Sequence, residues 1–469
     1  MASSRPHRAW VVWAAAGAAF ALAAALPLPD GLSRQGAYAI AALAAAIVLW
    51  ASGVQDPALS GLLLLTLLSV LGVLPFPDAV AGLGTEFVWL LVVTFILAEA
   101  MAHTGLGRRI ALVLLHRAGG RPDAVLLAVL GSAVILAFVV PTAAGRASMI
   151  VPVCLGIVEA AGLGPGSRLA TAMLLGTSFA SVMAGVGIMT AAGATVYAAG
   201  AFARLAGWGW SYSGWLAAFF PLVVVFVLVV WRLLLALFPP ERVTLAGGAA
   251  YVEEQLRRRG ALSPGERRVL AAVIVMFALW VVGPRWHVTT AQAGMIGVLP
   301  LLLPGLQVLT WERALAAVRW NVIILFGVAL ALAEALDRSG ASHWLTAGAL
   351  AAVPRPTPVA TALILTPVVL LARIGFVNNL GMIAAGLPLA FTLARGWGLN
   401  PVWVGMLVVM TAGPGFVLPT QTPTGMITAG YQMYTMRDHM RAGMVASAVL
   451  LVLTWCAALV YWPLLGYGP

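Results

Sequence analysis

Long apolar runs recur along almost the whole chain and constrain its fold more than any other feature. Each run has about the 20 mainly apolar residues that a helix needs to cross a bilayer. With 62% hydrophobic and only 9% charged residues, the 469-residue chain has too few charges to cover a water-soluble globule. Such runs predict spanning helices, which satisfy their own backbone groups in lipid. Eleven candidate spans lie near residues 10–28, 36–52, 58–75, 86–103, 168–205, 213–238, 269–284, 289–309, 321–337, 401–430 and 441–465.

Two further apolar stretches, near residues 123–160 and 358–395, are each too long for one span. Polar or helix-breaking residues interrupt both of them, so we predict two re-entrant hairpins. The first apolar run follows Arg5 and Arg8 and resembles a signal peptide, but many further spans come after it. We therefore interpret it as the first span of an all-α polytopic membrane protein.

The basic residues predict how the chain is oriented in the membrane. All 26 are arginine, and 15 acidic residues leave a formal charge of +11. In a membrane protein such an excess belongs to cytoplasmic loops, so we expect no nucleic-acid partner. With the N-terminus in the cytoplasm and the C-terminus outside, seventeen arginines fall inside and six outside, while Arg146, Arg232 and Arg373 lie at membrane depth. The lysine-free, alanine- and arginine-rich composition favours a bacterial inner membrane.

Two similar halves flank a polar segment. The stretch 97–105 resembles 332–340, with Glu99 matching Glu334 at an offset of 235 residues, and the same offset aligns 73–79 with 308–314. We predict a first half over 1–238, a cytoplasmic linker over 239–268 and a second half over 269–469. Because the copies begin after an even and an odd number of crossings, they should be inverted. Inverted repeats are typical of alternating-access carriers, which hold their substrate near the midplane.

Four helix breaks occupy matching places in the two halves. They lie at 141–146 and 185–195 in the first half, and at 375–381 and 413–425 in the second. A broken helix offers unpaired N–H groups and a partial positive charge to an anion. A single break is more often a matter of packing, but four matching breaks predict a binding site.

The motifs around these breaks resemble those of the divalent-anion/sodium symporter family, the dicarboxylate and sulfate carriers of the ion transporter superfamily. The C-terminal stretch 419–443, with Thr422-Pro423, a Gly-Tyr pair and Asp438, is similar to the family's end signature. The resemblance covers nearly the whole chain. It implies a homodimer with a scaffold domain, and a transport domain that carries both hairpins and moves like an elevator.

The hairpin tips depart from this family's usual Ser-Asn-Thr, which helps to bind sodium and substrate carboxylates. Here the tips are 142–144 and 378–380, and only Asn379 keeps the asparagine. Side-chain oxygens that a hard cation prefers are missing from the first half. Sodium is therefore a questionable coupling ion, and no other cofactor is expected. The resemblance implies substrate binding by Thr142, Arg146, Asn378, Asn379, Thr422 and Pro423, and cation binding by Thr142, Gly187, Asn379, Pro419 and Thr422.

Two arginines and two glutamates leave alternatives open. Arg146 follows Thr142 by one helical turn, and a guanidinium at membrane depth is a functional candidate because it is costly unless paired. It would bind a substrate carboxylate, replace a sodium ion or pair with backbone carbonyls. Arg373 precedes the second tip, with structural and functional roles equally open. Glu99 and Glu334 lie near span ends, where structural ion pairs are commoner than proton relays.

Other classes of protein lack the residues they require. The chain has no zinc-protease His-Glu-x-x-His, no Gly-x-Ser-x-Gly, and no Walker loop, since it has no lysine. Its two cysteines, Cys154 and Cys456, lie too far apart in the sequence for a disulfide framework or a metal cluster. We therefore predict a secondary carrier, not an enzyme, for a small divalent anion such as succinate or sulfate. The alternative is proton-coupled or exchange transport of another organic acid or oxyanion.

Overall fold

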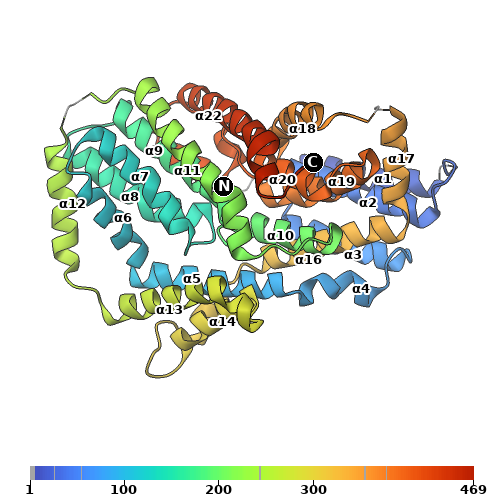
Figure 1. The fold of residues 1–469 in the computed structure, drawn as a ribbon, viewed down its shortest axis with the longest axis horizontal. Coiled ribbons are helices and arrows are strands. Elements are labelled where there is room, and N and C mark those ends of the chain that lie inside the picture. The colour runs from blue at the N-terminus through green and yellow to red at the C-terminus, as the bar shows by residue number, and fades with distance from the viewer. Residues whose placement is uncertain (1–5, 26, 54, 242–243, 353–354, 377) are drawn as a thin grey trace.

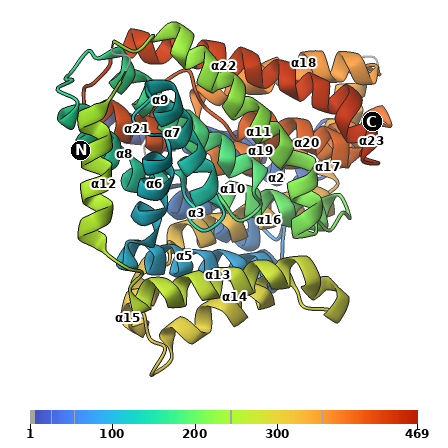
Figure 2. The same cartoon turned by 60° about the vertical axis from the view of Figure 1, so that its left-hand side comes forward.

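The computed structural model describes residues 6–25, 27–53, 55–241, 244–352, 355–376 and 378–469. Regular secondary structure in these ranges is helical throughout, as Figures 1 and 2 show. Ten of the described helices are long and apolar enough to cross a membrane. Arg5, Arg242 and Val377, which entered the sequence predictions, lie outside the described residues.

The helices of the first half run to residue 237, and one further helix, α12, lies between the halves. Their bounds are α1 (Pro6–Ala25), α2 (Arg34–Ser52), α3 (Pro57–Val70), α4 (Phe76–Val80), α5 (Glu86–Thr104), α6 (Leu106–Arg117), α7 (Pro122–Ala137), α8 (Ala143–Ala160), α9 (Arg168–Gly187), α10 (Gly193–Leu205), α11 (Tyr212–Leu237) and α12 (Ala246–Arg259).

The second half repeats the same order of long and short helices. Their bounds are α13 (Pro264–Val282), α14 (Thr290–Val298), α15 (Trp311–Ala317), α16 (Trp320–Arg338), α17 (Ala341–Ala352), α18 (Pro358–Ala372), α19 (Asn379–Trp397), α20 (Pro401–Ala412), α21 (Pro423–Gly430), α22 (Met436–Cys456) and α23 (Trp462–Leu464). Short 3-10 segments lie at 81–84, 283–286, 299–302, 373–375 and 419–421.

Polar caps explain why the helices begin where they do. Asp56 accepts a hydrogen bond from the Ala58 N–H at the start of α3, and Pro57 supplies the first helical residue. Ser263 and Glu266 form a reciprocal capping box at the start of α13. These starts are local in the sequence, because the capping side chain and the N–H group it accepts from are two or three residues apart.

The helices form two packed groups. A scaffold group comprises α1–α5 and α13–α16, in which α16 packs on α3 and α5 packs on α14. A hairpin group comprises α7–α11 and α18–α22, in which α9 packs on α7, α8 and α11, and α19 packs on α20. The chain passes between the groups through α6, α12 and α17, and Figure 1 shows α5, α13 and α14 below the hairpin group.

Contacts between helix ends agree with the predicted inversion of the two halves. The order from α5 to α11 recurs from α16 to α22. Ser33 bonds Ser339, Arg204 pairs with Glu334, and Arg313 pairs with Glu99. Each of these contacts joins ends that the sequence places on the same side of the membrane, which supports antiparallel halves.

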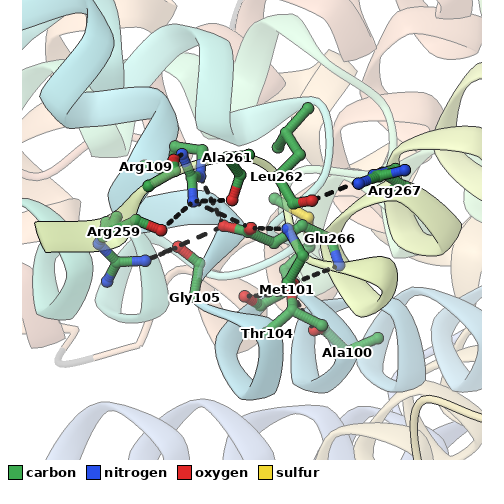
Figure 3. Close-up of polar contacts among 12 residues, drawn as sticks. Ala100, Met101, Thr104, Gly105, Arg109, Arg259, Ala261, Leu262, Glu266 and Arg267 are labelled. Atoms are coloured by element: carbon green, nitrogen blue, oxygen red, sulfur yellow. Dashed lines mark hydrogen bonds and ion pairs between the residues drawn. The ribbon is translucent and has the colours of Figure 1, made fainter. Parts of the chain in front are cut away.

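A buried charge cluster joins two of the connecting helices to the scaffold group (Figure 3). Arg109 at the start of α6 donates two hydrogen bonds to Glu266 of α13, at 2.7 and 3.1 Å. Its other bonds reach the carbonyls of Arg259, Gly260 and Ala261 in the α12–α13 turn. Arg259 in turn donates to the Gly105 carbonyl, between α5 and α6. Both α6 and α12 therefore leave the scaffold group from one charged junction.

The structure confirms the breaks predicted at 185–195 and 413–425. The runs 168–205 and 401–430 are each two helices separated by residues outside α-helix, α9 with α10 and α20 with α21. The run 289–309 is helical only to residue 302, since the chain turns at the positive-φ residue Gly305. The predicted linker 239–268 contains α12 and the first residues of α13, which begins at Pro264 after a capping box.

Candidate functional site

Four helix N-termini meet at one cavity of about 580 Å³. They belong to the two hairpins and the two broken helices, and their N-cap residues are Thr142 of α8, Ala192 of α10, Asn378 of α19 and Thr422 of α21. All four caps line the cavity. Because each helix N-terminus carries a partial positive charge, this arrangement favours an anion.

The caps differ in how many backbone donors they leave free. Thr142 and Thr422 each accept a hydrogen bond from the N–H three residues on, both at 3.1 Å, and Asn378 accepts one from Leu380 at 2.9 Å. Ala192 has no side chain that accepts a bond, so the first N–H groups of α10 remain for a ligand. Thr142 and Asn378 cap the equivalent hairpin helices α8 and α19, and Ala192 and Thr422 cap the equivalent broken-helix segments α10 and α21.

Arg146 ties the first hairpin to the first broken helix. Its side chain is fully buried. One terminal nitrogen donates to the carbonyls of Val140 at 2.5 Å and Ala191 at 3.0 Å, and the other donates to Ser181 at 2.6 Å. The guanidinium therefore bonds backbone oxygens, and two of them belong to unwound segments. Of the alternatives that the sequence left open, the structure shows carbonyl pairing.

Arg373 makes the corresponding contacts in the second half. It is also fully buried and donates to the carbonyls of Phe376, in the second hairpin break, and Gln421 at 2.7 Å, in the second broken helix. Gln421 returns a bond to the Arg373 carbonyl at 3.4 Å. The arginine that the sequence left undecided thus has the same kind of partners as Arg146.

The scaffold group supplies the opposite wall. Asp56 and Asn321 line the cavity, and the Asn321 amide donates to the Asp56 carboxylate at 3.4 Å. Arg319 at the start of α16 also lines it. The charged residues of the lining are therefore Arg146, Arg319, Arg373 and Asp56, so the described wall carries a net positive charge. Asp56, Asn321 and Gln421 were not among the predicted site residues, although the Asp-Pro pair that starts α3 indicates a capped helix start.

The structure brings together some predicted site residues and not others. Asn379 and Pro423 line the cavity with Thr142, Asn378 and Thr422. Gly187 and Pro419, predicted to bind a cation, are outside the lining. Gly187 ends α9 against α11, where an added Cβ would lie 2.3 Å from Val223, so close packing accounts for this glycine. Pro419 is buried in the short segment before Thr422.

Glu99 and Glu334 lie away from the cavity lining. Glu99 pairs with Arg313 at 2.7 Å, and Glu334 pairs with Arg338 at 2.7 Å and Arg204 at 3.4 Å. Arg338 also reaches Asp78 at 2.5 Å. The Arg313 and Asp78 contacts join the short helices α15 and α4 to long scaffold helices of the other half, Arg204 joins α10 to α16, and the Glu334–Arg338 pair lies within α16. Among the described residues, His, Cys, Asp and Glu form no group of three placed to hold a metal ion.

A family model described as the sodium:sulfate symporter transmembrane region matches residues 7–467. The chain belongs to this family. Membership of the sodium:sulfate symporter family makes it a multi-pass membrane transporter rather than an enzyme, with a small anion as its substrate.

Two curated relatives and one solved structure give the comparison more detail. The sodium-dependent dicarboxylate transporter SdcS of Staphylococcus saprophyticus subsp. saprophyticus is 27% identical over 88% of this chain and 83% of its own length. The L-tartrate/succinate antiporter of Escherichia coli (strain K12) is 28% identical over 82% of this chain and 80% of its own length. The solved structure of the YdaH transporter of Alcanivorax borkumensis matches with a TM-score of 0.56 at 14% identity, covering 84% of this chain and 89% of that one. At that identity the likeness concerns the fold alone.

Proposed function

We propose that this chain exchanges C4-dicarboxylates such as succinate across the inner membrane, with sulfate as the alternative substrate. The observation that carries the proposal is the electropositive cavity at which four helix N-termini meet. Its volume of about 580 Å³ is within the range of about 300–1,000 Å³ of ligand pockets. The names of two relatives, a dicarboxylate transporter and a tartrate/succinate antiporter, support this substrate class.

Transport in this proposal does not require sodium. A sodium ion at a helix break needs oxygen ligands, and unwound carbonyls are the usual source in carriers. Here guanidinium nitrogens donate to the carbonyls of Val140, Ala191 and Gln421. Arg146 and Arg373 thus supply fixed positive charges where an ion would otherwise bind. The side chains of Thr142 and Asn379 then contact the substrate at the two hairpin tips, and Thr422 contacts it at the second broken helix.

The same proposal covers movement and orientation. The hairpin group would carry the site across the membrane against the scaffold group, as an elevator. The protein would be a homodimer. In each protomer the two repeat halves span 1–238 and 269–469, on either side of the linker 239–268. The N-terminus would be cytoplasmic and the C-terminus outside. In that orientation the α2–α3 turn and the start of α16, which border the cavity, face the cytoplasm.

Exchange in proteoliposomes tests this function. Vesicles loaded with unlabelled succinate should take up labelled succinate equally well in sodium and in choline buffer, and empty vesicles should not. Labelled sulfate tests the alternative substrate in the same assay. Uptake that needs a sodium gradient would overturn sodium independence, and uptake driven by a proton gradient into empty vesicles would favour proton coupling. Uptake of neither anion would overturn the substrate class.

Arg146→Ala tests the replacement of a cation by the arginine. The substitution removes the three hydrogen bonds and opens a group of carbonyl oxygens. Sodium should therefore raise the apparent melting temperature of Arg146→Ala and leave that of the wild type unchanged. Arg232→Ala is the matched control, because Arg232 lies over the Trp231 ring and outside the cavity. Equal sodium responses in all three proteins would contradict the proposed role.

A further inference from the structure

Arg319 is a charged residue of the cavity wall, and the function proposed above assigns no role to it. It lies at the N-cap of α16, in the scaffold group, and its side chain is exposed to the cavity. Within the described part of the chain, no hydrogen bond or ion pair engages its guanidinium. A guanidinium has five N–H donors suited to a carboxylate or a sulfate.

The other charged side chains of the cavity wall already have hydrogen-bond partners within the protein. Arg146 and Arg373 donate to backbone carbonyls behind the tips. Asp56 caps α3 with one oxygen and accepts from Asn321 with the other. Arg319 is therefore the lining cation whose donors are left for an incoming anion, among the residues that the structure describes.

The first half has no arginine at the position equivalent to Arg319, so the repeat places this cation at one end of the scaffold group only. At the offset of 235 residues that aligns Glu99 with Glu334, Arg319 corresponds to Gly84 and Asn321 to Glu86. Glu86 is exposed in the first turn of α5. Since the halves are inverted, the opposite membrane face has a carboxylate near the place where this face has a guanidinium.

We propose that Arg319 is an anion-docking residue that binds one carboxylate, or an equivalent oxyanion, of the substrate before it reaches the hairpin tips, at one membrane face only. The inference rests on the proposed function, in which a small dianion enters through this cavity. A scaffold residue contacts substrate only when the cavity is open on its side, whereas the tips contact it on both sides. A cation in a cleft raises the local concentration of anions, and salt screens the effect within about 8 Å at physiological ionic strength.

Cysteine reactivity tests the docking charge without any transport. Asn321→Cys in a Cys456→Ser background places a thiol beside Arg319, and the remaining Cys154 is fully buried. The thiol should react faster with a sulfonate-bearing methanethiosulfonate than with its trimethylammonium counterpart, and succinate should slow the reaction. Adding Arg319→Gln should lower the anion-to-cation rate ratio roughly three- to tenfold. Adding Arg285→Gln, an exposed scaffold arginine outside the cavity lining, should leave the ratio unchanged.

Transport tests the one-sidedness. In succinate exchange, Arg319→Gln should raise the half-saturating concentration roughly three- to tenfold at one face and leave it unchanged at the other. Arg319→Lys should restore most of the loss, and Arg285→Gln should resemble the wild type. Equal changes at both faces, or an unchanged reactivity ratio in Arg319→Gln, would overturn the inference. If the wild type exchanges no succinate, the proposed function fails, and the reactivity ratio still decides whether Arg319 attracts anions here.

Discussion

Burying a guanidinium costs several kcal/mol unless its donors find partners. Arg146 and Arg373 meet this condition with backbone carbonyls rather than carboxylates, so each keeps its charge unneutralised beside the cavity. The sequence placed Arg146 near the first tip because Thr142 is only four residues away. It did not reveal the partners Ser181 and Ala191, which lie 35 and 45 residues further along the chain.

Glu241 gives a prediction at the same scale. It follows α11, and its carboxylate accepts hydrogen bonds from the N–H groups of Arg168 and Leu169 at the start of α9. Burial is the largest single influence and raises its pKa, but these backbone bonds together with Ser167 outweigh it and leave the pKa below the ordinary 4.5. A lowered pKa means stabilisation that is present above about pH 4.5 and is lost as the pH falls through the folded-state value.

Glu241→Gln should therefore lower the apparent melting temperature at pH 7, by the equivalent of about 0.3–1 kcal/mol for a carboxylate at a helix N-terminus. The difference from the wild type should shrink as the pH falls below 4.5. Thermal melts in detergent between pH 4 and pH 7 measure it. Glu253→Gln, at an exposed position of α12, is the control. A difference that does not vary with pH would contradict the capping role.

For individual helices, the first residue was more predictable from the sequence than the length. Thr142, Asn378 and Thr422 cap helices at breaks that the sequence located, because a capping side chain and the N–H group that donates to it are close in the sequence. Apolar length alone did not separate α9 from α10 or α20 from α21, since both helices of each pair are hydrophobic. The four N-termini meet at one cavity because of packing between segments far apart in the sequence, and amino-acid composition does not predict such packing.

The Arg109–Glu266 junction gives a prediction for the connecting helices. The Glu266 side chain is only 3% exposed, so removing Arg109 leaves a buried carboxylate without its main partner. Arg109→Ala should destabilise the protein by about 3–5 kcal/mol, measured as a lower apparent melting temperature. Arg108→Ala, which removes only a 3.4 Å bond to Gln255, should have a much smaller effect.

The double variant Arg109→Met with Glu266→Met separates charge from packing. Because it leaves no unpaired buried charge, it should be less destabilised than the sum of the two single changes. Purely additive losses would show that the ion pair contributes nothing beyond the separate contacts of each side chain.

At the scale of the whole molecule, the inversion of the two halves was predictable from the repeat and from the number of crossings before each copy. The grouping of α1–α5 with α13–α16 was not, because it arises from packing between segments more than 200 residues apart, such as α3 with α16. Neither the repeat nor the helix packing gives the absolute orientation, which rests on the distribution of arginines between loops.

Cysteine labelling tests that orientation. In a Cys456→Ser background, a membrane-impermeant maleimide should label Arg285→Cys in intact cells. It should label Glu253→Cys only in inside-out vesicles, since α12 is predicted to be cytoplasmic. Both positions are exposed. The reverse pattern would turn the cavity to the outer face, and labelling of both positions from one side would contradict the predicted topology.

The two buried arginines also have an electrical consequence. A guanidinium is protonated at physiological pH, so a site that holds Arg146 and Arg373 carries two positive charges there. With a bound dianion the moving site would be neutral, and the membrane potential would do almost no work on it. Empty, it would carry about two charges through a field that weighs about 2.3 kcal/mol per charge at 100 mV. A negative-inside potential would then oppose the outward return of the empty site, so that one-for-one exchange would be the favoured cycle for uptake.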